Sequence, residues 1–215
     1  GIFANWIYEQ IGYRGIWPDI LAMVLVFLQG LLVNIIDFEQ KLSREITLFP
    51  GVFLVLLTSL IPDFLHLSPF HFANIFLLLA IQALMGTFRV GKCADRIYNA
   101  GLLIGLAGMF VPGYWIFLIF VFVALNSLRS FSFRERLMAL SGFFTVYFLA
   151  GVYHFWFDRF DYFFKVQVDS VIALLDFRQG NLFTLIHLLF LGCFLLFVLF
   201  SHNYLTNKQI MRTQK

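Results

Sequence analysis

The sequence predicts an all-α fold, a polytopic transmembrane helical bundle with six or seven membrane segments. Of its 215 residues, 61% are hydrophobic and only 13% are charged. A soluble domain carries about twice that share of charge, so lipid must cover much of this chain. Apolar runs recur at close to the roughly 20 residues with which a helix crosses a bilayer. Barrel-type alternation is absent, and lipid offers no hydrogen bonds to an open sheet edge, so these segments are expected to be helices.

We expect a single transmembrane domain over residues 1–215 that lacks an N-terminal portion. The chain opens with GIFANWIYEQIGYRGIWPD, which has neither the charged leader nor the cleavage site of a signal peptide. This opening is typical of an interfacial segment already in progress, so at least one further span is expected upstream.

Five apolar runs have the composition of ordinary spans, interrupted by few polar residues such as Gln29, Asn34 and His187. Each run of about 16 to 21 residues suffices for the hydrocarbon core with little tilt. They cover residues 17–36, 46–61, 71–88, 137–157 and 181–200.

Residues 100–125 form an uncharged run of 26, too long for one span and too short for two. Proline cannot continue a helix and glycine accepts unusual dihedral angles, so Pro112-Gly113 predicts a short helical hairpin here. Two re-entrant arms and two short spans remain open alternatives with the same topology. The first arm should pack closely on a neighbour through its small residues, Gly101, Gly105, Ala107 and Gly108.

Eleven of the fifteen Lys and Arg residues fall in alternate connecting segments and in the tail. The positive-inside rule places these segments in the cytoplasm, and with them the basic tail 204–215 and the C-terminus. The segments around Arg44, Lys92, Arg134 and Arg212 should therefore share one side. The segment 158–180 falls outside, and its apolar residues Phe164 and Val168, with others at helical spacing, predict an amphipathic surface helix over 162–177.

Catalytic motifs such as a phosphate-cradling glycine loop or a nucleophile elbow are absent from the sequence. The net charge of +3 is too small to suggest nucleic acid. Cys93 and Cys193 stand apart and make neither a disulfide framework nor a zinc spacing. The spans carry no deeply placed charge, which argues against an ion-coupled transporter.

Two clusters of titratable residues fall on the expected outside face. In PDFLHLSPFH, Asp63, His66 and His71 are candidates for a divalent metal site, and Asp63 for a catalytic base. The alternative is that they are ordinary helix-end and interfacial residues. In HFWFDRFD, His154 and Asp158 are spaced to share a helical face, with Asp161 following, so Asp158 is a second catalytic candidate. An interfacial anchor with Trp156 explains the same residues.

Within residues 31–157, the pieces ANIFLLLA, NAGLLIGLA and SFRERLMALSGFFTVYFLAGVY resemble a family of uncharacterised multi-pass inner-membrane proteins of Bacteroidetes, a domain-of-unknown-function family. The resemblance implies a bacterial inner (cytoplasmic) membrane location. More distantly, the block is similar to membrane glycosyltransferases that use polyprenyl-phosphate sugars. Their catalytic carboxylate sits in the first outside loop, of which only Glu9 and Asp19 would remain here. Their basic residue before the hairpin proline is replaced by Val111.

The first functional hypothesis is a non-catalytic component or scaffold of cell-envelope biogenesis, with the lipid bilayer and membrane proteins as partners. The second is a polyprenyl-linked sugar transferase with Glu9, Asp19 or Asp63 as its base, and a third is a small-molecule transporter. Whether the chain is an enzyme stays open. No cofactor is evident, and a divalent cation or polyprenyl phosphate is expected only for the transferase.

Overall fold

The structure is a computed structural model that describes residues 1–12, 15–42, 47–60, 66–88, 90, 93–128 and 132–169. The chain divides into two compact units, Gly1–Ile172 and Ala173–Lys215, and all described residues lie in the first. The expected span 181–200 and the basic tail 204–215 lie outside the described residues, as does the end of the expected surface helix.

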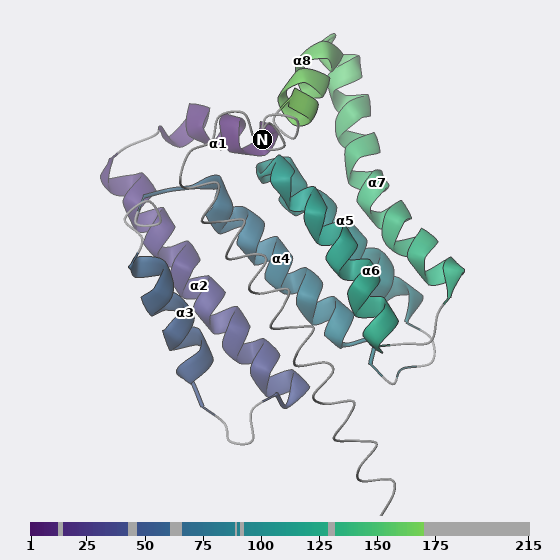
Figure 1. The fold of residues 1–215 in the computed structure, drawn as a ribbon. Helices are drawn as coiled ribbons and strands as arrows, with labels where there is room; N and C mark the ends of the chain where they lie inside the picture. The colour runs from purple at the N-terminus through teal and green to yellow at the C-terminus, as the bar shows by residue number, and fades with distance from the viewer. Residues whose placement is uncertain are drawn as a thin grey trace, which may run out of the picture. The chain divides into compact units, whose positions relative to one another are not determined.

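The described residues are helical and contain no strand, which confirms the all-α prediction (Figure 1). The order is α1 (Ile2–Ile11), α2 (Ile16–Gln40), α3 (Phe49–Ser59), α4 (Pro69–Met85), α5 (Ala94–Phe110), the 3₁₀ turn η2 (Pro112–Ile116), α6 (Phe117–Leu128), α7 (Phe133–Trp156), α8 (Phe160–Phe164) and the π-helical turn η3 (Lys165–Asp169).

Five helices pack in the order α3, α2, α4, α5, α7, each against the next, and α6 lies against α5 and α4 (Figure 1). Among the described residues, α2 and α7, with 25 and 24 residues, are the two helices long and apolar enough to cross a membrane by themselves. The apolar segments Phe49–Ser59, Pro69–Met85 and Pro112–Asn126 are shorter. The described residues thus contain two helices of span length, whereas the sequence predicts six or seven membrane segments over the whole chain. Helix ends at Ser59, Met85 and Phe110 make the other described apolar helices shorter than a span.

The predicted reversal at Pro112-Gly113 is present. Helix α5 ends at Phe110, Val111 is extended, and the 3₁₀ turn leads into α6. Val121 and Leu125 of α6 then pack in the same core cluster as Ile97 and Ile104 of α5. The two arms therefore form a helical hairpin.

The seam between α5 and α7 is built on glycines. A Cβ added to Gly101 would lie 1.9 Å from the Ala139 carbonyl oxygen, and one added to Gly142 would lie 2.2 Å from the Tyr98 carbonyl oxygen. The two backbones are in direct contact, which the small residues permit. The prediction of close packing by the first hairpin arm is confirmed, and its partner is α7.

Helices α2 and α3 meet in a similar way. A Cβ on Gly51 would lie 2.3 Å from the Gly30 carbonyl oxygen. The amide of Gly51, in the first turn of α3, has no acceptor within its own helix, and it donates to the Asn34 side-chain oxygen at 2.9 Å. A polar residue of α2 thereby caps its neighbour.

The segment after α7 differs from the predicted surface helix. Phe163 and Gln167 are its buried residues, whereas Phe164, expected on the apolar face, is 58% exposed. The chain is helical over the described residues of this segment, and contact of Phe164 with a membrane surface stays a prediction. The expected face assumed a continuous α-helix, but the chain widens into a π-helical turn at Lys165 and turns Gln167 toward the end of α5.

Candidate functional site

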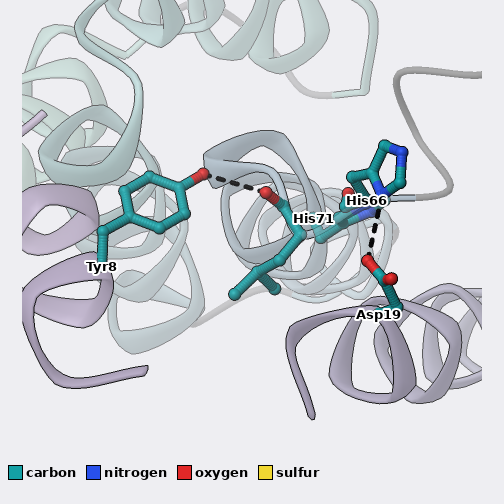
Figure 2. A network of polar contacts seen from close by, with 5 residues as sticks. Tyr8, Asp19, His66 and His71 are labelled. Carbon is teal, nitrogen blue, oxygen red and sulfur yellow. Dashed lines mark hydrogen bonds and ion pairs between the residues drawn. The ribbon is translucent and has the colours of Figure 1, made fainter. Parts of the chain in front are cut away.

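Side chains from α1, α2 and the segment before α4 meet at one end of the helices (Figure 2). We call Tyr8, Asp19, Gln29, His66 and His71 the α1–α2–α4 cluster. The local sequence explains where the segment before α4 lies. Ser68 caps α4 by accepting from the Phe70 amide at 3.4 Å, and Pro69 opens that helix, so Leu67 and His66 leave it at a fixed point.

Asp19 of α2 and His66 of the segment before α4 form a hydrogen-bonded pair. The His66 Nδ1 atom lies 3.0 Å from Asp19 Oδ1, and Asp19 sits in the first turn of α2. Since a carboxylate can only accept, Nδ1 is the donor and carries the proton. The side chains are 63% and 47% exposed, so the pair faces solvent and contributes little stability, about 0–1 kcal/mol.

His71 lies inside the cluster and is 1% exposed. Its Nε2 atom donates to the His66 carbonyl oxygen at 3.2 Å. The Gln29 amide from α2 donates to the His71 carbonyl oxygen at 2.9 Å, and the Tyr8 hydroxyl from α1 donates to the Leu67 carbonyl oxygen at 3.1 Å. These bonds tie α1 and α2 to the start of α4.

The Asp19–His66 pair is the part of the cluster that can do chemistry. An imidazole whose Nδ1 proton is held by a carboxylate presents Nε2 as a base or as a single metal ligand. His71 cannot join it through Nε2, because that atom is spent on a carbonyl. Within the described ranges, no group of three or more His, Cys, Asp or Glu side chains could hold a metal ion.

The structure places the predicted site residues in different surroundings. Asp63 lies outside the described residues, so the Asp63, His66 and His71 metal site and the catalytic role of Asp63 stay predictions. Glu9, the other carboxylate suggested as a base, is exposed on α1.

The predicted pairing face of His154 and Asp158 does not form. Helix α7 ends at Trp156, and Asp158 follows in a left-handed conformation with φ of 52°. The His154 Nδ1 atom donates instead to the Ala150 carbonyl oxygen at 2.8 Å, and its ring packs against Phe163. Asp158 and Asp161 are exposed.

A second polar network was not predicted from the sequence. Pro112 has no amide hydrogen, so the Gly108 carbonyl lacks the donor that a continuous helix would supply. The Gln167 amide provides it at 2.7 Å and also reaches the Tyr147 hydroxyl, which accepts from Trp115. The available signal was the proline four residues after Gly108, but its distant partner left no trace in the local pattern.

Comparison with known proteins adds no relative. No protein-family model, no curated protein and no solved structure matches the chain.

Proposed function

We propose that the protein is an integral membrane protein that crosses the membrane several times and serves as a non-catalytic component or scaffold of the bacterial cell envelope. The observation that carries the membrane proposal is the bare apolar surface of the two span-length helices. In both α2 and α7, only 28% of the most apolar window is buried. Met23 and Phe27 of α2 are 75% and 62% exposed, and Phe148 and Phe155 of α7 are 69% and 70% exposed.

Exposure of such an apolar surface to water is unfavourable. Soluble monomers rarely expose contiguous apolar patches beyond a few hundred Å², and larger ones indicate a membrane or a protein partner. Lipid and neighbouring membrane proteins are the proposed partners of these faces.

The basic residues support a bacterial inner-membrane orientation. Lys41, Arg96, Arg134 and Arg136 lie near the Gln40, Ala94 and Phe133 helix ends, whereas Arg159 and Lys165 follow the opposite end of α7. By the positive-inside rule the first group is cytoplasmic, together with the segments around Arg44, Lys92 and Arg212 and the C-terminus.

The non-catalytic role is supported by how the histidines are used. His71 and His154 both donate to nearby carbonyl groups, which fixes helix ends rather than preparing a reaction. The Asp19–His66 pair is the single arrangement in the cluster that favours the second candidate, a polyprenyl-linked sugar transferase with Asp19 as base. A divalent cation or polyprenyl phosphate is expected only with this second function.

Topology is tested with single cysteines in a chain whose Cys93 and Cys193 are replaced by serine. We expect Asp161→Cys to react with a membrane-impermeant maleimide in intact cells, and Ser132→Cys to react only after the membrane is opened. The protein should also remain in the pellet during alkaline carbonate extraction. Labelling of Ser132→Cys from outside, or release by carbonate, would contradict the proposal.

Catalysis is tested with Asp19→Asn in a strain that lacks the native gene and shows an envelope defect. A scaffold predicts full rescue by Asp19→Asn at a wild-type level of membrane protein. Loss of rescue at that same level would instead favour the transferase.

A further inference from the structure

An apolar groove lies between the C-terminal half of α7 and α8. Phe148, Gly151 and Phe155 line it from α7, and Phe160, Phe163 and Phe164 line it from α8. The groove has a volume of about 570 Å³, within the range of about 300–1,000 Å³ that small-molecule sites occupy.

The groove is open because of one glycine and several uncovered aromatic rings. A Cβ added to Gly151 would have Phe160 Cε2 as its nearest neighbour, at 3.9 Å, so this position is spacious. Phe148, Phe155 and Phe164 are more than half exposed, while Phe163 is buried. The polar side chain in the lining is Tyr147, whose hydroxyl already accepts from Trp115. An occupant must therefore be apolar where it touches these walls.

Charged residues of both signs follow directly where α7 ends. Asp158 and Arg159 form the turn into α8, Asp161 lies in α8, Lys165 opens η3, and all four are exposed. An apolar groove followed by a turn that carries charges of both signs has the same arrangement as the acyl chain and headgroup of a zwitterionic phospholipid. An acyl chain fits the groove, a phosphate suits Arg159, and an ammonium group suits the carboxylates.

We infer that the groove binds one acyl chain of a zwitterionic phospholipid, with the phosphate held at Arg159. A second protein copy fits less well, because nine residues line the groove and a stable protein interface needs roughly 20–30 residues a side. The inference rests on the proposed membrane location.

Native mass spectrometry of the purified full chain in detergent tests the chain site. The probe is a phosphatidylethanolamine with one 16-carbon and one 18-carbon chain. Gly151→Leu fills the groove and should weaken binding at least roughly tenfold, which is about 1.4 kcal/mol. Ser141→Leu, a matched change at an exposed position of α7 outside the groove, should bind like wild type. Unchanged binding by Gly151→Leu, or an equal loss in both variants, would overturn the site.

The headgroup is tested in the same way with the phosphatidylglycerol of identical chains. Phosphatidylethanolamine should bind more tightly, because its ammonium group meets the carboxylates, and Asp158→Asn combined with Asp161→Asn should remove that preference. Arg159→Gln should weaken the binding of both lipids, since both carry the phosphate. Equal or tighter phosphatidylglycerol binding, or a dimer that Gly151→Leu dissociates, would overturn the assignment. Carbonate extraction separates the two proposals: if the protein stays in the membrane while Gly151→Leu binds normally, only this inference fails.

Discussion

Gln167 replaces the backbone donor that Pro112 removes from the end of α5, and it shows how a distant side chain completes a helix. The Gln167 side chain is only partly hydrogen-bonded, because its Oε1 atom is buried without a hydrogen-bond partner among the described residues. The residue therefore acts through its amide nitrogen alone.

Gln167→Glu keeps the shape and removes the donor, so it should lower the stability of the folded protein. An unsatisfied buried carbonyl costs about 1–3 kcal/mol, and a buried carboxylate costs more. Thermal unfolding in detergent measures the loss. Gln10→Glu, at an exposed position of α1, is the matched control and should change little. Equal effects of the two substitutions would show that the Gly108 bond contributes nothing.

Asp19 and His66 should be only weakly coupled. Because both side chains are partly exposed, a double-mutant cycle with Asp19→Asn and His66→Gln should give about 0.2–1 kcal/mol, decreasing as salt is added. Unfolding at low and high salt provides the measurement. A salt-insensitive coupling above this range would contradict the exposed position of the pair.

Sequence reasoning identified these two residues but not their pairing. They are 47 positions apart, and their contact depends on how α2 packs against α4, which no local pattern encodes. Gln29 and Asn34 were likewise noted only as interruptions of an apolar run. Polar residues inside such runs often bond a neighbouring helix, but the sequence does not say which carbonyl or amide they reach.

Among the elements, the α5–α7 seam is the most sensitive to added volume. Gly101→Ala and Gly142→Ala place a methyl group against a carbonyl oxygen at 1.9 and 2.2 Å, so the helices must separate. Overpacking of this kind costs about 1–3 kcal/mol. Gly151→Ala, on α7 like Gly142, would make only an ordinary van der Waals contact and serves as the control. We expect the first two variants to unfold at lower temperature, and comparable stability of all three would disprove a tight seam.

The small residues of α5 allowed this close packing to be predicted, and Pro112-Gly113 allowed the reversal to be predicted. The segment after α7 departs from a continuous α-helix at Lys165. Helical spacing in a sequence assumes about 3.6 residues a turn, and the π-helical turn at Lys165 breaks that assumption. Since one wider turn rotates every later residue, periodicity alone cannot locate the buried side of this segment.

For the whole molecule, the exposed face of α2 should contact hydrocarbon. Phe27→Lys puts a charge in the middle of the helix, where insertion costs about 2.5–3.5 kcal/mol. Phe38→Lys lies near the helix end, from which a lysine can reach the interface. The membrane-inserted fraction, measured by carbonate extraction, should therefore fall for Phe27→Lys and stay near wild type for Phe38→Lys. Equal insertion would place this face away from lipid.

The lengths of the packed helices have a consequence for the membrane itself. At 1.5 Å per residue, α2 and α7 are each roughly 36–38 Å long. Helices α4 and α5, which lie between α2 and α7 in the packing order, are each only about 26 Å long. A hydrocarbon layer of about 30 Å is thicker than this middle pair. With the proposed membrane location, we expect the bilayer to become thinner beside the middle helices, at a cost of fractions of a kcal/mol per ångström. Thin bilayers reduce that cost, so hydrophobic mismatch would bias the protein toward the thinner regions of a membrane.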